Sequence, residues 1–334
     1  MVQQIAIIGA GNIGHDHIRR IAGSVAGARL SVVFDVDTDR AQEVAAEVGA
    51  RTVAGVDPLI AADDVDAVIV ASPGPLHPEQ TLACLAAGKP VLCEKPLGTT
   101  VEDCLRVVEA EASLGRRLVQ VGFMRRYDHG YRQVKRVLDS GEVGEAVMVH
   151  AVHRNPEVPA SFTSDMSLTD SVVHEMDVTR WLLGEEVVAV TVLAGRRSPW
   201  ANAHLQDPQL VLMETASGVL VDVETFVSCQ YGYEVRCEVV GSTGTVSLDT
   251  PSFGAVTSAG SRGRAVPGHW RERFADAYRS ELQSWVDGMA AGQVTGPSAW
   301  DGYAATAIAV AAVEAQTRRQ RTVVELVDKP ALYA

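Results

Sequence analysis

The feature that most constrains this chain is an apolar run that passes directly into a glycine-rich turn. Ile5–Ile8 are followed by Gly9, Gly11 and Gly14, with the spacing G-x-G-x-x-G. At a strand–helix junction, the first glycine permits a tight turn and the second lets a pyrophosphate approach the backbone. The third lets the helix pack closely on the sheet. Because the N–H groups that open such a helix attract phosphate, the stretch predicts a dinucleotide-binding site.

An acidic residue, Asp35, closes the next apolar run, residues 30–34. At this place in a dinucleotide-binding unit, a carboxylate accepts hydrogen bonds from the adenosine ribose and repels the 2′-phosphate of NADP. No arginine follows directly, and the nearest positive charge is Arg40. We therefore expect NAD as the cofactor. A second interpretation stays open, in which Asp35 caps the helix expected near residues 38–47.

Length and charge narrow the class of protein. With 334 residues, 47% of them hydrophobic and 21% charged, the chain has the composition of an ordinary globular protein with two domains. Its net charge of −13 argues against nucleic-acid and anionic-membrane partners. The apolar run at residues 304–313 is too short to cross a bilayer. We expect a small-molecule partner, with no nucleic acid and no membrane.

The cysteines indicate a reducing compartment. The chain has five, an odd number, and none of them forms a C-x-x-C pair. This usage is typical of reduced, mostly buried thiols, and it provides neither a disulfide framework nor a zinc site. The first apolar run starts within a few residues of Met1, which leaves no room for a signal peptide. We expect a cytoplasmic protein with no bound metal.

The first third of the chain alternates short apolar runs with amphipathic stretches. The expected strands are residues 5–9, 30–35, 67–71, 91–94 and 118–122. The expected helices lie near residues 13–22, 40–48, 78–87 and 102–114. This β–α–β alternation is typical of a doubly wound parallel sheet of the α/β class. We assign residues 1–123 to an NAD-binding Rossmann domain.

The pattern changes after residue 123, where a β-rich region lies between helices. The expected strands are residues 146–153, 187–194, 209–215, 219–226, 234–241 and 322–326. The expected helices are residues 131–139, 275–291 and 300–317, with hairpin turns at 216–218 and 242–244 and a glycine- and serine-rich surface loop at 254–268. We assign residues 124–334 to an α+β domain with a large, mostly antiparallel open sheet, for substrate binding and assembly.

Three polar segments stand at places where a ligand could be held. Ser72 and His77 follow one expected strand, and Glu94–Pro96 follow another. The carboxyl ends of parallel strands meet at the edge of the sheet where ligands bind. Asp170 and His174 are four residues apart, which places an acid and a histidine on one face of a helix.

Together these segments resemble the Gfo/Idh/MocA family of nicotinamide-dependent sugar and cyclitol dehydrogenases, across essentially the whole chain. The triplet Glu94-Lys95-Pro96, followed later by the D-x-x-x-H helix, is specific to that family. Further stretches are similar to its inositol-oxidising members; they are residues 122–128, 153–156, 231–238 and 296–303. The resemblance implies the two-domain fold, NAD as the cofactor and a polyol or sugar as the substrate.

The resemblance also implies a set of site residues. The catalytic residues would be Lys95, Asp170 and His174. Those that bind the cofactor would be Gly9, Gly11, Asn12, Ile13, Gly14, Asp35, Ser72, Pro73, His77, Glu94 and Lys95. Those that bind the substrate would be Lys95, Arg125, Asn155, Asp170, His174 and Tyr233.

The residue types suit the oxidation of a secondary alcohol, which moves a hydride to the nicotinamide and a proton to a base. A histidine, with an ordinary pKa of about 6.5, can accept that proton at neutral pH, whereas a lysine, with an ordinary pKa of about 10.4, is already protonated. We therefore expect His174 to be the general base and Lys95 to stabilise the developing alkoxide by its charge. Asp170 would orient the imidazole and favour its charged form.

Simpler interpretations of some of these residues stay open. Lys95 taken alone would be a solvated surface charge, and the Asp–His pair would be an ordinary hydrogen bond on a helix surface. A zinc-protease pattern is absent, because the last position of the H-E-x-x-H motif that His174 would begin is Val178. Two further histidines, His15 and His17, alternate at a helix start, and we expect them at the surface or behind the site.

The interpretation of two other pairs of residues also stays open. Arg125 and Arg126 could indicate a phosphate or carboxylate on the substrate, although we expect one of them to pair with Asp128 or to face a helix. Tyr231 and Tyr233 share one face of an expected strand, and one of them would serve packing alone.

The expected reaction is NAD-dependent oxidation of myo-inositol to 2-keto-myo-inositol, with formation of NADH. The alternatives are oxidation of scyllo-inositol or a pyranose sugar and, in another class, a non-catalytic sugar sensor, which would be expected to lack the lysine or the histidine. We also expect a homotetramer, because alternate apolar positions such as Val219, Val221 and Val223 predict a sheet with one face covered by its own helices and one that needs a partner. The family resemblance further implies a cis bond between Lys95 and Pro96.

Overall fold

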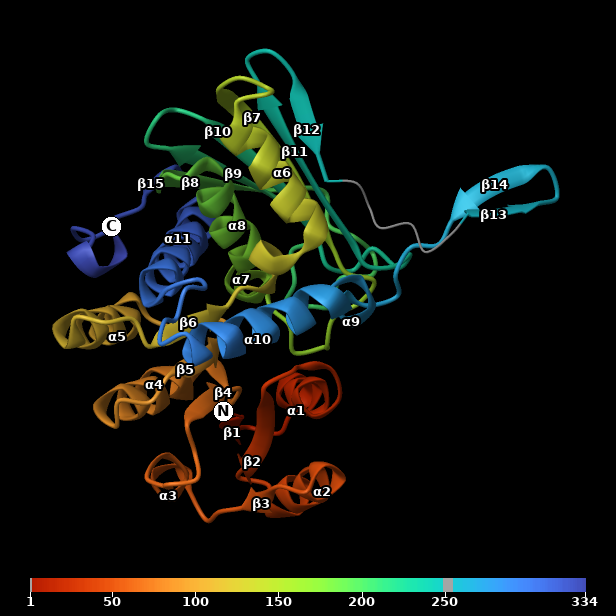
Figure 1. The fold of residues 1–334 in the computed structure, drawn as a ribbon. Coiled ribbons are helices and arrows are strands. Elements are labelled where there is room, and N and C mark those ends of the chain that lie inside the picture. The colour runs from red at the N-terminus through yellow and green to blue at the C-terminus, as the bar shows by residue number, and fades with distance from the viewer. Residues whose placement is uncertain (1, 249–254) are drawn as a thin grey trace. The chain divides into compact units, whose positions relative to one another are not determined.

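The computed structural model describes residues 2–248 and 255–334. These residues form two compact units, which Figure 1 shows as ribbons. The first unit comprises the chain up to residue 123 together with residues 278–306 and 327–334. The second comprises residues 124–277 and 307–326.

The first unit is built on a parallel sheet of six strands. They are β1 (Gln3–Ile8), β2 (Ala28–Phe34), β3 (Arg51–Thr52), β4 (Ala67–Val70), β5 (Val91–Glu94) and β6 (Val119–Gly122). Their order is β3-β2-β1-β4-β5-β6, which is the Rossmann order. The five expected strands are therefore confirmed. The two-residue β3 was not predicted, because so short an element carries no periodic pattern.

Helices connect these strands as expected. They are α1 (Asn12–Ser24), α2 (Thr38–Val48), α3 (Val56–Ile60), α4 (His77–Ala86) and α5 (Val101–Leu114). On α1, Gly14, His17, Ile18 and Ile21 are buried, which is the spacing of one helix face. The N-terminus of α5 is fixed by Thr100, whose side chain accepts a hydrogen bond from the Asp103 backbone N–H. Only α3, a single turn, was not predicted.

The C-terminal part of the chain divides between the two units. The helix α10 (Ala275–Ala290) contributes Leu282, Trp285 and Val286 to the same hydrophobic core as β1 residues such as Ile5. Residues 278–306 therefore lie in the first unit instead of continuing the contiguous second domain expected from residue 124 onward. The reason is apolar burial, because this segment completes the core beneath the Rossmann sheet.

The second unit is built on a mixed sheet of seven strands. They are β7 (Ala146–Arg154), β8 (Val187–Ala194), β9 (Gln209–Thr215), β10 (Leu220–Phe226), β11 (Glu234–Gly241), β12 (Thr245–Ser247) and β15 (Thr322–Val323). Their order is β12-β11-β7-β10-β9-β8-β15, and every pair is antiparallel except β7 with β10. The expected mostly antiparallel sheet and its hairpin turns are confirmed. The helices of this region are α6 (His129–Ser140), α7 (Ser164–Met166), α8 (Val173–Leu183), α9 (Trp270–Arg273) and the latter part of α11 (Ala299–Arg318).

The two faces of this sheet differ. Val219, Val221 and Val223 are at most 7% exposed, and Val219 lines a hollow together with Leu138 of α6 and Leu182 of α8. These valines therefore lie on the covered face of the sheet. Leu220, on the opposite face, is 48% exposed, and Asp222 beside it pairs with a histidine of β7. A partner would have to meet this second face, which is called the open face below.

One expected loop is instead a hairpin. We expected residues 254–268 to be a loop, but β13 (Ala255–Ser258) and β14 (Ser261–Arg264) pair antiparallel. The prediction was wrong for residues 255–264, and residue 254 lies outside the described residues. The turn consists of Ala259 and Gly260, both with positive φ (47° and 75°), which is the backbone of a tight two-residue hairpin turn. The composition indicated a loop, because serine and glycine carry no strand pattern.

All five cysteines are free, and four of them are buried. Within residues 2–248 and 255–334, no helix is both long enough and apolar enough to span a bilayer.

Candidate active site

The three glycines of the loop after β1 have different surroundings. Gly9 has φ +97°, and a Cβ there would lie 2.5 Å from the Ala71 carbonyl oxygen. A Cβ on Gly14 would lie 2.0 Å from the Gly9 oxygen, whereas one on Gly11 would meet no described atom within 4 Å. The first and third glycines are thus required by the protein's own packing. Gly11 faces open space at the N-terminus of α1, where a pyrophosphate fits.

Two further predicted cofactor residues, Asn12 and Ile13, form the first turn of α1. Asp35 lies directly after β2 and is 7% exposed. Its Oδ2 accepts a hydrogen bond from the Ala10 N–H at 2.7 Å, so the acid is tied to the glycine loop. The N-cap of α2 is Asp37, not Asp35, so the capping interpretation of Asp35 is wrong. This position fits an acid that meets the adenosine ribose.

We expect an Asp35→Ser variant to accept NADP far better than the native chain does. The carboxylate opposes a 2′-phosphate, and Arg40, whose Nη1 lies 3.6 Å from Asp35 Oδ1, would then be able to meet that phosphate. The ratio of kcat/KM for NAD over NADP should fall by about tenfold or more, since juxtaposed like charges cost several kcal/mol. The exposed neighbour Asp39, changed to serine, is the control and should leave the ratio unchanged. A native preference for NADP would show that the assignment of Asp35 is wrong.

The residues after β4 lie at the carboxyl edge of the same sheet. Ser72 Oγ donates to Gln80 Oε1 at 2.6 Å, and Pro73, which is exposed, leads into a short helical turn. The His77 ring is buried. Its Nε2 lies 2.7 Å from the Ser72 carbonyl oxygen, and its Nδ1 lies 2.7 Å from the Pro96 carbonyl oxygen. His77 therefore joins the segment after β4 to the segment after β5. Its predicted part in cofactor binding stays a prediction.

The Glu94–Pro96 triplet begins at the last residue of β5. Glu94 is 4% exposed, and its Oε2 accepts a hydrogen bond from the Lys95 backbone N–H at 3.2 Å. Its Oε1 lies 2.6 Å from Nε2 of His17. The Lys95–Pro96 bond is cis, which confirms the prediction. Lys95 itself is half-buried at this edge.

The two histidines near the start of α1 have different surroundings. His15 pairs at the surface with Glu47, at 3.2 Å. His17 is fully buried and contacts Glu94, a residue 77 positions away. A signal for this was present in the sequence, because His17 belongs to the inward stripe of α1 that begins at Gly14.

In the second unit, Asp170 and His174 belong to one continuous helical segment. Its first part, Ser167–Val172, is π-helical, and α8 follows from Val173. The expected helix is therefore present, but Asp170 lies in a wider turn than an α-helix has. Asp170 is exposed, whereas His174 is 8% exposed. Such π-helical turns inside α-helices are frequent at functional sites.

Arg125 lies in a buried charged cluster. It is 1% exposed and forms an ion pair with Glu175, the residue that follows His174. His153 Nδ1 lies 3.1 Å from Arg125 Nη2 and 3.0 Å from Glu175 Oε2. Burial alone would raise the pKa of Glu175, but Arg125 and His153 outweigh it and lower that pKa. Arg125 thus uses its charge inside the protein, which does not favour an anionic substrate.

The neighbouring arginine also faces a helix. Arg126 Nε donates to Asp177 of α8 at 2.9 Å. This agrees with the expectation that one of the two arginines faces a helix. Asp128, the other expected partner, accepts from Arg273 Nη1 through its Oδ2 at 2.7 Å. Sequence reasoning named neither Glu175 nor His153 as a site residue, although Glu175 directly follows His174 and His153 begins the recognised stretch 153–156.

Asn155 and Tyr233 meet at one end of the seven-stranded sheet. Asn155 follows β7 and Tyr233 precedes β11, and the adjacent residues Arg154 and Glu234 are paired in the antiparallel register. Asn155 Oδ1 is a buried acceptor with no hydrogen-bond partner among the described residues. Tyr233 is 4% exposed and packs edge-on against His153, with ring centroids 5.9 Å apart. The structure thus brings these two predicted substrate residues together beside the Arg125 cluster.

The second tyrosine lies elsewhere. Tyr231 is 49% exposed, and its hydroxyl accepts a hydrogen bond from Arg154 at 2.8 Å. It also contacts Glu234. Of the two tyrosines, only Tyr233 lies beside the buried cluster.

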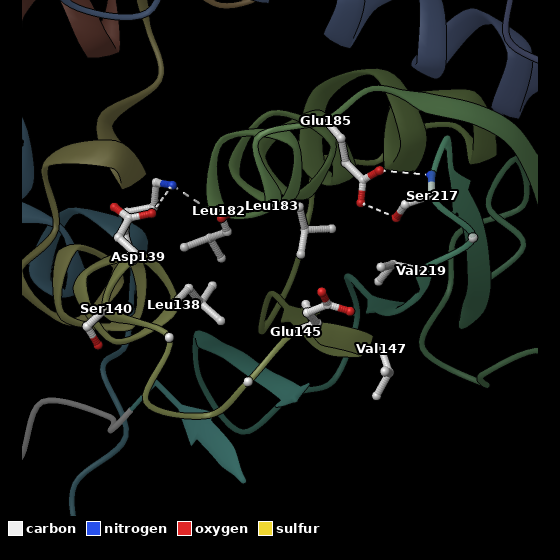
Figure 2. Close-up of a pocket in the computed structure, with 15 residues that line it drawn as sticks. Leu138, Asp139, Ser140, Glu145, Val147, Leu182, Leu183, Glu185, Ser217 and Val219 are labelled. Atoms are coloured by element: carbon white, nitrogen blue, oxygen red, sulfur yellow. Dashed lines mark hydrogen bonds and ion pairs between the residues drawn. The ribbon is translucent and has the colours of Figure 1, made fainter. Parts of the chain in front are cut away.

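The second unit also has an open hollow of about 1040 Å³, which Figure 2 shows in close-up. Leu138, Leu182 and Val219 provide apolar lining, and Glu185 accepts hydrogen bonds from the Ser217 backbone and hydroxyl at 2.9 Å each. None of the predicted site residues lines it. The volume of a cavity therefore does not identify the expected polyol site here.

Removing the Glu175 charge should destabilise the protein. In a Glu175→Gln variant, Arg125 would remain buried without its ionised partner, and breaking such a pair costs about 3–5 kcal/mol. The lowered pKa of Glu175 means that the stabilisation is present above its unfolded pKa of about 4.3 and is lost as pH falls through the folded value. Urea unfolding at several pH values should show that the variant has a lower free energy of unfolding. It should also show that this free energy depends less on pH in the acid range than it does in the native protein. The exposed Glu142, changed to glutamine, is the control, and equal stability of the two variants would contradict the prediction.

The fold and the site elements together define a class of protein. A Rossmann sheet with an open glycine loop and an acid after β2, in a chain that also presents a lysine at a strand end and a histidine on a buried helix, is a nicotinamide-dependent oxidoreductase. The chain belongs to the Gfo/Idh/MocA family: residues 3–123 match the family's NAD-binding Rossmann fold and residues 135–326 match its C-terminal alpha/beta domain.

Individual relatives are similar over the whole chain. Inositol 2-dehydrogenase 3 of Saccharopolyspora erythraea is 54% identical over 333 residues, which cover 100% of this chain and 98% of that protein. The crystal structure of myo-inositol dehydrogenase from Lactobacillus casei, in complex with NAD(H) and myo-inositol, has a TM-score of 0.98 and 36% identity, with 100% of both chains covered. The scyllo-inositol dehydrogenase of the same organism, with bound NAD(H) and scyllo-inositol, has a TM-score of 0.90 and 26% identity, with 97% and 99% covered.

Proposed function

We propose that this chain is an NAD-dependent inositol 2-dehydrogenase, which oxidises myo-inositol to 2-keto-myo-inositol and forms NADH. The observation that carries the proposal is the full-length likeness, at a TM-score of 0.98, to a dehydrogenase solved with both NAD(H) and myo-inositol. The 54% identity to a named inositol 2-dehydrogenase supports the same substrate. The open Gly11 position and the buried Asp35 fit NAD on this chain's own geometry.

The proposed chemistry divides between three residues that act on one substrate molecule. NAD, when bound, supplies the acceptor for the hydride that leaves the carbinol carbon. His174 takes the hydroxyl proton, so that the C–H and O–H bonds break together and a ketone remains. The Lys95 ammonium stabilises negative charge on the oxygen as the proton leaves. Asp170 favours the imidazolium that forms on His174.

The substrate-binding groups suit a neutral polyol. Asn155 offers a buried acceptor that has no partner among the described residues, and Tyr233 offers a hydroxyl close by. Arg125 is engaged with Glu175, so it does not provide the free positive charge that a phosphorylated substrate would need. A site of convergent hydrogen-bonding groups without a metal is what a cyclic alcohol requires.

The decisive experiment measures NADH formation with a panel of inositol stereoisomers and aldoses. The proposal expects the highest kcat/KM for myo-inositol. The scyllo-inositol enzyme that this chain also resembles makes scyllo-inositol the second candidate, and a higher kcat/KM for that isomer would establish it. Binding of NAD and inositol without NADH formation would instead show a sugar sensor.

We further propose that the protein assembles as a homotetramer in the cytoplasm. Apolar side chains lie on the open face of the second unit; they are Met148, Val152, Leu193, Leu210, Leu212 and Leu220. A hollow of about 630 Å³ on this face is also lined by charged residues, which gives it the mixed chemistry of an interface between copies. The free cysteines agree with a reducing compartment.

A Leu220→Lys variant should dissociate into smaller species. Leu220 is 48% exposed on the open face, and a charge placed there would be buried in the assembled protein. Light scattering at micromolar concentration should show the mass of four chains for the native protein and a lower mass for the variant. Leu114 of α5 is 45% exposed, and Leu114→Lys is the control that should keep the native mass. A monomeric native protein would rule out the assembly.

A further inference from the structure

We propose that His17 is a positioning residue for Lys95 and acts through the carboxylate of Glu94. The inference rests on the proposed function, because it concerns how the lysine is presented for the reaction. It assigns a role to a histidine that neither the sequence motifs nor the proposed chemistry use. All the contacts that carry it lie within the first unit.

The contacts form a chain from α1 to the turn that bears the lysine. The His17 ring lies on the buried face of α1, with Nε2 2.6 Å from Glu94 Oε1. A carboxylate only accepts, so the ring nitrogen is the donor. The other carboxylate oxygen, Oε2, accepts the Lys95 backbone N–H at 3.2 Å. One side chain thus connects the helix after the glycine loop to the peptide of the lysine.

The carboxylate needs these donors because it is removed from water. Glu94 is 4% exposed and His17 is fully buried, and an ionised carboxylate at such a place is costly unless it is hydrogen-bonded. The carboxylate occupies the space that Gly122 leaves open, since a Cβ on this residue would lie 3.0 Å from Glu94 Oε2. If the imidazole is lost, the buried carboxylate has to turn toward another donor or toward water, and Oε2 then leaves the Lys95 N–H.

The imidazole in turn is held in one orientation. Tyr278 packs edge-on against it, with ring centroids 5.9 Å apart, and Arg20 lies over the tyrosine ring at 4.8 Å. Its second nitrogen, Nδ1, has no hydrogen-bond partner among the described residues, so the contact with Glu94 is the ring's polar anchor. On the far side of the lysine, His77 Nδ1 lies 2.7 Å from the Pro96 oxygen. The turn is thus held at both ends by buried imidazoles.

This arrangement has a functional consequence. The N-terminus of α1 is where the glycine loop would hold the pyrophosphate, and the middle of α1 holds the carboxylate that fixes the Lys95 peptide. The same helix therefore positions both the cofactor and the lysine. Losing the imidazole should loosen the lysine while the glycine loop, which does not involve His17, still binds NAD.

Three variants test this. His17→Leu removes the donor, His17→Gln retains one in its side-chain amide, and His15→Leu is the matched control, because His15 lies on the same helix at the surface. The first measurement needs no substrate: hydrogen exchange of the Lys95 amide, resolved to single residues by mass spectrometry. It should be about tenfold faster or more in His17→Leu and close to native in the other two.

The second measurement is kcat for inositol, divided by the fraction of sites that bind NAD, which removes any loss due to misfolding. We expect His17→Leu to lose about tenfold to hundredfold, which is the cost of a small misplacement of a reacting group. The KM for NAD should change by less than about threefold. His17→Gln should recover most of the activity, whereas a residue needed only for packing would gain nothing from an amide.

The two failures are distinguishable. If the native protein does not oxidise inositol but the Lys95 amide still exchanges faster in His17→Leu, the proposed function fails and the positioning contact stands. If the amide exchanges at the native rate in His17→Leu, or if kcat per NAD-binding site is unchanged, the inference is overturned. It is overturned as well if His15→Leu has the same effects as His17→Leu.

Discussion

A His174→Ala variant should lose about two to four orders of magnitude in kcat for inositol while still binding NAD, because it removes the group that accepts the hydroxyl proton. The histidine is 8% exposed at the start of α8, and it belongs to the second unit, whereas the glycine loop and the Rossmann sheet belong to the first. Steady-state kinetics together with an NAD titration would separate the loss of turnover from any loss of cofactor binding. The exposed His129→Ala variant is the control, with native activity expected.

The pH dependence gives a second sign of the same role. In the native enzyme, kcat/KM should rise with pH as the imidazole loses its proton, since only the neutral ring can act as a base. That rise should be absent from the small residual activity of His174→Ala. Near-native turnover of the variant, or a rise with pH that persists in it, would show that another group accepts the proton.

A Lys95→Ala variant should lose about two to three orders of magnitude in kcat, which is typical when one group that stabilises developing charge is removed. Lys95 follows β5 on a turn that is fixed by Glu94 and His77, so its ammonium is presented by a rigid element. The variant should keep the rise of activity with pH, because His174 is still present. Lys329→Ala, at an exposed position, is the control.

The two variants together decide the roles. If the rise with pH vanishes in Lys95→Ala but persists in His174→Ala, the lysine is the base and the assignments must be exchanged. If both variants keep near-native activity, neither residue takes part in the chemistry, and the proposed mechanism is wrong as a whole.

Much of the fold could be predicted because the local spacing of apolar residues specifies many of its strands and helices. The strands at residues 91–94, 187–194, 209–215 and 234–241 were predicted with the bounds that the structure shows. Alternation between short apolar runs and amphipathic stretches indicated a parallel sheet, and its strand order is the Rossmann order. The glycine spacing placed the dinucleotide loop, because a tight turn and close packing require residues without a Cβ.

What the sequence could not decide was which distant residues would meet. The contact between His17 and Glu94 joins residues 77 positions apart, and that between Arg125 and Glu175 joins residues 50 apart. Neither pair has a spacing that a motif records. Only the packing of helices on sheets brings such side chains together and excludes water, and burial then makes their pairing obligatory.

The sequence by itself determined the Rossmann unit and the cofactor loop, since these depend on residue type and short-range spacing. It also supplied the residues that we propose for the chemistry. The tertiary structure decided that α10 joins the first unit and that the valines of β10 face inward. It also decided which buried partners hold Lys95 and Arg125 in place. The physical reason is that apolar burial acts on surfaces that form only when distant segments pack, and no local pattern specifies which segments those will be.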